Sequence, residues 1–155
     1  LAGAVAAALP SEGRLAFGRV DEVDRAAVAQ ADRVYAGFWT NRGDCGDELA
    51  EVLASLADKD VFLFGTAGFG ADETYFAGVM ARVAVHLPES ARIVGTFMCQ
   101  GRMPASVRAR YAQTAEAKPE QAARMHQLIE NFDEAASHPD DDDLARLREA
   151  VQAAS

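Results

Sequence analysis

The sequence predicts an α/β domain with a doubly wound parallel sheet, because strand-like and helix-like segments alternate over its first two thirds. The run "VFLFG" is almost continuously apolar, which is typical of a parallel strand buried on both faces. Beyond residue 103 the pattern is helical, without further strands. We therefore expect one domain over residues 1–155, with the sheet and its crossover helices in 1–103 and a helical C-terminal extension in 104–155.

The composition favours one soluble domain and argues against several functional classes. Of the 155 residues, 50% are hydrophobic, and no apolar run reaches the length of about 18 residues that spans a membrane. The net charge of −9 argues against nucleic-acid binding, which needs a basic face. That charge fits docking on a basic partner, or solubility alone. Two cysteines make no disulfide framework, so a reducing cytoplasm is predicted.

The N-terminal part is expected to contain two helices and two strands. Residues 1–9 are apolar and precede a proline, which indicates the end of a helix. Residues 14–20, "RLAFGRV", predict a short strand that its glycine weakens. Residues 21–31 are expected to form one or two helical turns with Asp21 as the N-cap. The β-branched and aromatic "RVYAGFW", residues 33–39, predicts the second strand.

The same alternation continues through the middle of the chain. In residues 47–58, leucine and valine recur at helical spacing, and the buried strand follows at 60–65. A helix is expected over residues 71–87 with Asp72 as its N-cap, and a last strand over residues 91–101. Prolines near helix starts and the capping run "HPDDDD" then predict three more helices, over residues 104–117, 119–137 and 140–154.

The order of the elements raises a question about the start of the sheet. Four strands are predicted, yet the chain starts in a helix. A parallel α/β domain normally starts on a strand that leads into its first helix. We therefore expect a further strand to be supplied by residues upstream of residue 1.

Three loops follow predicted strands and share the edge of the sheet where doubly wound folds bind ligands: 40–47, 66–72 and 100–103. In the first loop, Phe38 and Trp39 end the strand, and Thr40 and Asn41 follow. Trp39 is the only tryptophan, and its ring would either stack on a flat ligand or cover the end of the core. The second loop contains Thr66, Ala67, Gly68, Phe69 and Gly70. Its glycines would let the backbone approach a ligand closely, or serve only a tight turn.

Common catalytic motifs are absent from the sequence. It contains no GxSxG, HExxH or GxxxxGK[ST] pattern. His86, His126 and His138 are scattered, and we expect structural or surface roles for them. Cys99 is expected to pack as a small buried residue. Cys45 lies beside acidic residues that oppose thiolate formation, and neither cysteine is near a histidine at metal-ligand spacing.

Two of the loops resemble those of the flavodoxin family. "RVYAGFWTNRGDCGDEL" is similar to the family's third strand, first flavin loop and following helix, and "VFLFGTAGFGADETYF" to its fourth strand and second flavin loop. "GTFMCQGRMP" and "IENFDEAASHPDDDDL" are similar to a bacterial flavodoxin-like subgroup, the BilS type, which has a helical C-terminal extension. The resemblance implies that FMN is the cofactor.

The resemblance also implies which residues contact the flavin. Trp39 or Phe38 would stack on one face of the ring, with Thr40 and Asn41 as neighbours. Tyr75 would form a second aromatic wall. The backbone of the second loop would lie along the ring, through Thr66, Ala67, Gly68, Phe69 and Gly70.

The chain departs from the family at its start. Flavodoxins hold the FMN phosphate in a T-G-N-T-like loop between the first strand and the first helix, and that loop would precede residue 1. In the family's strand order, 2-1-3-4-5, the predicted strand over residues 14–20 would then have no neighbour. We expect the missing strand to come from upstream residues or from a second chain.

The sequence leaves three functional hypotheses open. The resemblance favours an FMN-binding electron carrier that serves a redox partner with a basic docking face. The alternative on the same fold is an NAD(P)H-dependent flavin or quinone reductase, for which Arg42 and Arg102 are the candidate phosphate ligands. The third hypothesis is a cofactor-free interaction module, because the helical extension could bind a partner.

Overall fold

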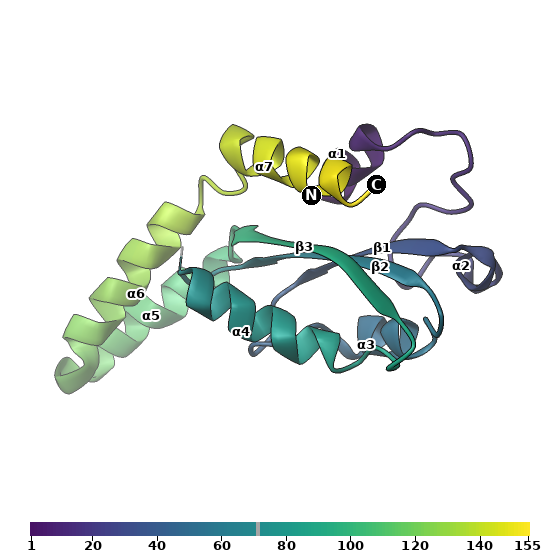
Figure 1. Ribbon diagram of the computed structural model, residues 1–155. Helices are drawn as coiled ribbons and strands as arrows, with labels where there is room; N and C mark the ends of the chain where they lie inside the picture. The colour runs from purple at the N-terminus through teal and green to yellow at the C-terminus, as the bar shows by residue number, and fades with distance from the viewer. Residues whose placement is uncertain (71) are drawn as a thin grey trace.

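The computed structural model describes residues 1–70 and 72–155, and it has three parallel strands with helices on both faces (Figure 1). The prediction of an α/β domain with a parallel sheet is confirmed. The strands are β1 (Arg33–Trp39), β2 (Asp60–Ala67) and β3 (Arg92–Gln100). The helices are α1 (Ala2–Ala8), α2 (Arg25–Gln30), α3 (Asp47–Ala54), α4 (Glu73–Ala84), α5 (Ala105–Ala117), the 3-10 helix η1 (Pro119–Gln121), α6 (Ala122–Ala135) and α7 (Asp141–Ala153).

Ion pairs join the amino ends of the three strands, whose order is β1-β2-β3, and the β2–β3 register shifts by one residue between Val61 and Phe62. Asp60 lies opposite Arg33 on one side and Arg92 on the other, at the amino ends of the three strands. Its carboxylate accepts hydrogen bonds from Arg33 at 3.0 Å and from Arg92 at 2.8 Å. With the amino ends level, the loops that follow the strands meet at the opposite edge.

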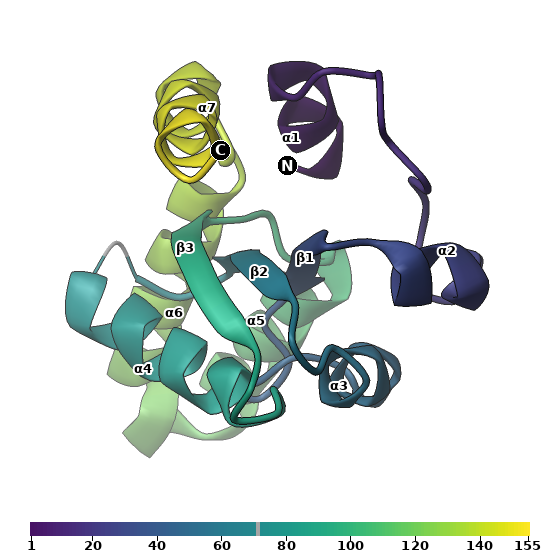
Figure 2. The same cartoon turned by 45° about the vertical axis from the view of Figure 1, so that its right-hand side comes forward.

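The central strand β2 supplies both hydrophobic cores. Val61 and Leu63 belong to the core that β2 shares with α3 and α4. Phe62 and Phe64 belong to the core on the other face, which α1 and α7 cover. Successive side chains of a strand point to opposite faces, so this alternation requires a helix layer on each side. Figure 2 shows the two layers, with α1 and α7 on one face and α3 and α4 on the other.

The predicted strand over residues 14–20 is wrong. Residues 9–24 contain neither a helix nor a strand, and Leu15 and Phe17 are exposed. The physical reason is that a strand needs a neighbour for its backbone hydrogen bonds. Among the described residues, β1 pairs only with β2, and no strand lies beside residues 14–20.

Aspartate N-caps define the starts of three helices. Asp72 accepts a hydrogen bond from the Thr74 amide at 2.8 Å, which confirms it as the cap of α4. Asp140 caps α7 in a reciprocal capping box, in agreement with the expected role of "HPDDDD". The prediction for α2 is corrected, because Asp24 rather than Asp21 is its cap. Asp21 instead pairs with Arg19 at 3.0 Å.

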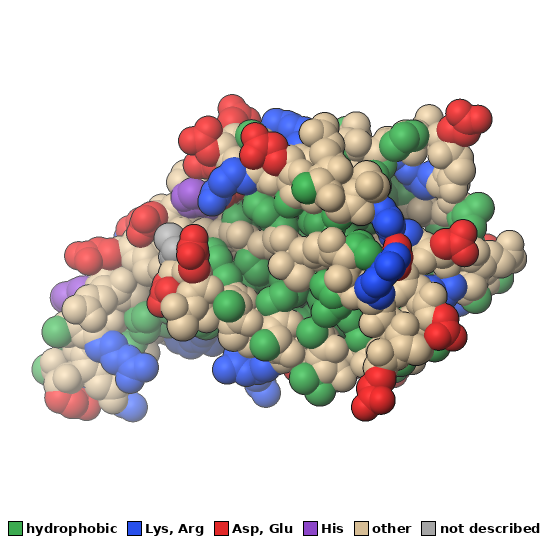
Figure 3. Space-filling model, in the orientation of Figure 1, with side chains coloured by type: hydrophobic (Ala, Val, Ile, Leu, Met, Phe, Trp, Pro, Cys, Tyr) green, Lys and Arg blue, Asp and Glu red, His purple; other side chains and the backbone are tan. Residues whose placement is uncertain are grey.

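The helical extension consists of a projecting hairpin and a helix that returns to the sheet. Helices α5 and α6 lie side by side beyond the end of the sheet, joined by the Arg108–Asp133 ion pair at 2.7 Å (Figure 1). On the face in Figure 3, hydrophobic side chains gather along β3 between α4 and α7, and most charged side chains lie around them. None of the described helices combines the length and apolar character needed to cross a bilayer.

We predict that Leu147→Ala destabilises the domain by about 2–5 kcal/mol, because Leu147 is fully buried between α7 and the sheet. Urea unfolding followed by circular dichroism measures the change. Arg148→Ala, on the exposed side of the same helix, should change the free energy of unfolding by no more than about 0.5 kcal/mol. Equal losses in the two variants would contradict the assignment of α7 to the core.

Candidate functional site

The sheet register brings the three predicted loops to one edge. Trp39 lies opposite Thr66, and Thr66 lies opposite Cys99 on β3. Two backbone hydrogen bonds continue the pairing beyond the strand ends, from the Thr40 amide to the Thr66 carbonyl at 2.8 Å and from the Gly101 amide to the Ala67 carbonyl at 3.0 Å. This carboxyl edge of the sheet is the candidate site.

At the end of β1, Trp39 and Phe38 have different surroundings. Phe38 is half-buried and its ring covers Gly65, where an added Cβ would lie 2.7 Å from the ring. Trp39 is 75% exposed. Of the two predicted stacking residues, Trp39 therefore has the free aromatic face. Next to it, the buried Thr40 hydroxyl has no hydrogen-bond partner among the described residues.

A tight turn closes the loop that carries Trp39. Asn41 and Asp44 pair in an antiparallel bridge, with N–H···O distances of 2.8 and 3.0 Å. Between them, Arg42 and Gly43 have positive φ angles of 52° and 85°, as the central residues of a type I′ turn do. Arg82 of α4 donates to the Gly43 carbonyl at 3.1 Å, which attaches the turn to the helix behind it.

The glycine loop presents Phe69 and is held by the helical extension. Phe69 is 38% exposed, and Gly70 has a φ of 69°, which favours glycine. The Asn131 side chain of α6 donates to the Gly68 carbonyl at 2.8 Å and accepts from the Gly70 amide at 3.2 Å. Two backbone groups of the predicted flavin-binding loop are thus bound within the protein. The role of Asn131 could not be predicted from the sequence, because the residue lies 61–63 positions from these glycines on a helix with no ligand motif.

The remaining predicted residues, Tyr75, Arg42 and Arg102, differ in burial and in contacts. Tyr75 is half-buried and packs against the core that contains Val79, with its ring centroid 6.1 Å from that of Phe76. Its role as an aromatic wall stays a prediction. Arg42 is exposed, whereas Arg102 donates to the Ala136 carbonyl at 2.9–3.0 Å and so fastens the third loop to the extension.

Both cysteines are buried, and their environments disfavour thiolates. Burial, followed by the negative charge of Asp44, raises the pKa of Cys45 to about 11. Burial, followed by the charge of Asp143, raises the pKa of Cys99 to about 12. No histidine lies at metal-ligand spacing from Cys45 in the sequence, but folding brings His86 close to Cys45 and Asp44. The two positions are 41 residues apart, so no spacing motif could indicate the contact.

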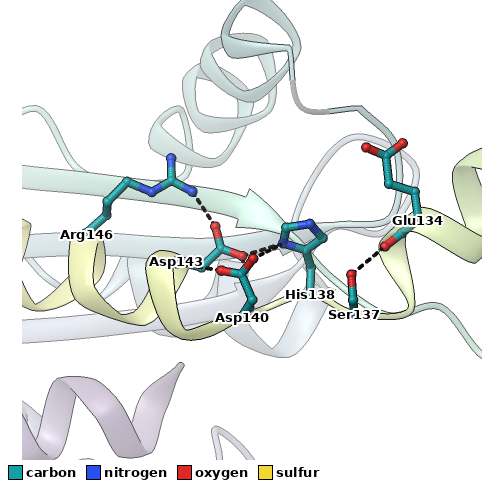
Figure 4. Close-up of polar contacts among 6 residues, drawn as sticks. All are labelled: Glu134, Ser137, His138, Asp140, Asp143 and Arg146. Atoms are coloured by element: carbon teal, nitrogen blue, oxygen red, sulfur yellow. Dashed lines mark hydrogen bonds and ion pairs between the residues drawn. The ribbon is translucent and has the colours of Figure 1, made fainter.

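A polar cluster lies where α6 meets α7, next to the end of β3 (Figure 4). The buried Asp143 carboxylate contacts His138 Nδ1 at 2.6 Å and the Asp140 amide at 3.1 Å, and it also pairs with Arg146. The cluster borders a cavity of about 230 Å³. That cavity is lined by Glu73, Phe76, Met98, Cys99, Gln100, Glu134, His138, Asp143 and Arg146. A larger hollow of about 350 Å³ lies between α2 and α3, away from the site.

Opposing effects set the pKa values of His138 and Asp143. The hydrogen bond with Asp143, aided by its charge, raises the pKa of His138. Burial alone would raise the pKa of Asp143, but the hydrogen bonds from His138 and the Asp140 amide, with the charges of His138 and Arg146, lower it overall. The charged pair therefore stabilises the fold between the lowered pKa of the acid and the raised pKa of the imidazole.

Comparison with known proteins identifies the family of this domain. The family model described as "Flavodoxin domain" matches residues 1–152. The chain belongs to the flavodoxin family. A flavodoxin-like domain-containing protein BilS from Clostridium symbiosum (strain WAL-14163) is 36% identical over 141 residues, covering 88% of this chain and 74% of the relative. BilS from Clostridioides difficile (strain CD3) is 29% identical over 113 residues, covering 73% of this chain and 64% of the relative.

The carboxyl edge of this flavodoxin domain fits the ring of FMN better than its phosphate. Trp39 and Phe69 offer exposed aromatic surface on neighbouring loops, and Thr40 has an unsatisfied hydroxyl among the described residues. The helix that follows the Trp39 loop starts with Asp47 and Glu48, whose charges would repel a phosphate at that helix terminus. The chemistry of these loops therefore suits a flat aromatic ring better than a phosphate.

We predict that Asn131→Ala loosens the glycine loop without unfolding the domain. It removes both hydrogen bonds to the loop, each of which contributes about 0.5–1.5 kcal/mol. Amide exchange measured by NMR should therefore become faster at Gly70. Gln127→Ala, at an exposed position of the same helix, is the control and should leave that exchange unchanged. Unchanged amide exchange at Gly70 in Asn131→Ala would show that the Asn131 side chain does not restrain the glycine loop.

We predict that the stabilising effect of His138 depends on pH. Because its pKa is raised in the folded state, its contribution is complete below the unfolded pKa of about 6.5 and is lost as the pH rises through the folded value. His138→Gln should therefore lower the free energy of unfolding more at about pH 5.5 than at about pH 9. Urea titrations at both pH values measure this difference. His126→Gln, at an exposed site on α6, is the control substitution.

Proposed function

We propose that this chain is part of an FMN-binding, flavodoxin-like electron-transfer protein. The observation that carries the proposal is Trp39, a largely exposed aromatic ring at the carboxyl edge of a flavodoxin-family sheet. Exposed tryptophan surface is costly in water, and stacking on a flat ring would remove it from solvent. FMN, when bound, supplies the redox chemistry.

The residues around Trp39 would orient the ring. Trp39 would cover one face, and the short turn closed by Asn41 and Asp44 would hold its loop in place. Phe69 and the backbone of the glycine loop would face the ring from the neighbouring strand. Because Asn131 already binds Gly68 and Gly70, that loop would meet the flavin in a fixed conformation, which lowers the entropic cost of binding.

The charge of the chain supports a proposal about its partner. With a net charge of −9, the protein would be attracted over long range to a redox partner that has a basic face. Such attraction raises the rate of encounter more than the final affinity. We place this exchange in the cytoplasm, where the two unpaired cysteines would stay reduced.

We predict that Trp39→Ala weakens flavin binding by about 1–3 kcal/mol, the size of stacking contributions measured by alanine substitution. Titrations with FMN and with riboflavin, which lacks the phosphate, separate ring contacts from phosphate contacts. Trp39 is the only tryptophan, so quenching of its fluorescence in the wild type would report the contact directly. The variant's reduction potential should also shift.

Phe17→Ala is the matched control, because Phe17 is an exposed aromatic residue in the irregular segment that leads to α2, outside the loops of the candidate site. It should leave flavin binding unchanged. If the protein that contains this chain bound neither flavin, the proposed function would be wrong. If it bound flavin equally well without Trp39, only the stacking role would be wrong.

A further inference from the structure

The turn after β1 and the end of α4 bring together three side chains with different metal-ligating atoms. Asp44 offers a carboxylate oxygen, Cys45 a sulfur and His86 a ring nitrogen, and these atoms all lie within 4.8 Å of one another. The Asp44 carboxylate and His86 Nε2 are already 3.0 Å apart. Small side-chain rotations would place all three around one ion.

The backbone holds these three positions before any ion binds. Asp44 closes the two-residue turn by pairing with Asn41, and its carboxylate accepts from the Cys45 amide at 2.7 Å. Arg82 ties the same turn to α4 through the Gly43 carbonyl. His86 lies two residues beyond the end of α4, and its amide donates to the Val83 carbonyl at 3.2 Å. Prearranged ligands bind metal more tightly because less conformational entropy is lost.

The burial of the three side chains suits an ion that enters from solvent. The side chains of Asp44 and His86 are 36% and 32% exposed, so an ion can reach both. Cys45 is only 7% exposed, and this burial would shield a metal–sulfur bond from water and oxidants. The neutral Cys45 thiol would lose its proton on binding, and the divalent ion would then neutralise both the thiolate and the Asp44 carboxylate.

We propose that Asp44, Cys45 and His86 bind a Zn²⁺ ion that fastens the Trp39 loop to α4. Mixed sulfur, nitrogen and oxygen ligands are typical of zinc, whereas magnesium and calcium require oxygen ligands. Three protein ligands leave the fourth tetrahedral position to water. This site does not depend on flavin binding.

The other histidine–aspartate cluster is less suited to a metal. Arg146 occupies one oxygen of Asp143, and His138 and the Asp140 amide share the other (Figure 4). An ion there would have to displace an arginine and disrupt the helix cap. Near Asp44, Arg82 donates to the backbone carbonyl of Gly43 and not to the three ligands.

The test uses cobalt as a spectroscopic probe for the zinc site. The untagged full chain, freed of metal with a chelator and kept reduced without flavin, is titrated with CoCl₂ and then with ZnCl₂. A thiolate-to-cobalt charge-transfer band that saturates at one equivalent, together with tetrahedral d–d bands, is the expected result. Zinc should abolish both signals. No charge-transfer band at one equivalent would overturn the proposal.

Matched variants identify the ligands. Cys45→Ser should abolish the charge-transfer band, and His86→Gln should weaken zinc binding by more than about 100-fold, since loss of an outer partner alone costs about 10–100-fold. Cys99→Ala and His138→Gln, which alter the other cysteine and the other cluster, should bind cobalt as the wild type does. A band retained in Cys45→Ser, or lost in Cys99→Ala or His138→Gln, would overturn the assignment. If Cys45→Ser fails to fold, the zinc affinity of His86→Gln is the deciding measurement, and an unchanged affinity would overturn the proposal.

Discussion

The structure depends on the burial of β2 on both faces. Val61, Phe62 and Leu63 have no exposed surface, and their side chains alternate between the two cores. Neither core could form without a helix layer over its face, since exposed apolar surface costs about 25 cal/mol per Å². The strand therefore determines the positions of β1 and β3 beside it and of four helices above and below. The position of that strand therefore also determines how the loops of the candidate site are arranged.

The helical extension is part of the site architecture as well as of the core. Helix α7 returns to cover the face opposite α3 and α4, and α6 supplies Asn131 to the glycine loop. Arg102 joins the third loop to the end of α6. Residues far along the chain thus hold two of the three loops at the carboxyl edge. Loops alone are usually the most mobile parts of such an edge, and these contacts restrict them.

Sequence patterns predicted those structural elements that depend on residues close together in the chain. The apolar run of β2, the aromatic β1 and the cap Asp72 were all predictable, because strand burial and capping involve neighbouring residues. The segment 14–20 has strand-like residues but no strand, since pairing depends on a neighbour that propensity does not report. The Cys45–His86 and Asn131–Gly70 contacts were unpredictable for a related reason. Each joins residues that only the packing of helices on the sheet brings together.

Helix α4 connects two parts of the candidate site. Its N-cap, Asp72, follows the glycine loop, and Arg82 in its last turn donates to the Gly43 carbonyl in the turn after β1. Because the backbone of a helix moves as a unit, a displacement of α4 would shift both loops together. The two loops are therefore mechanically coupled, and a substitution that moves one of them would also change the position of the other.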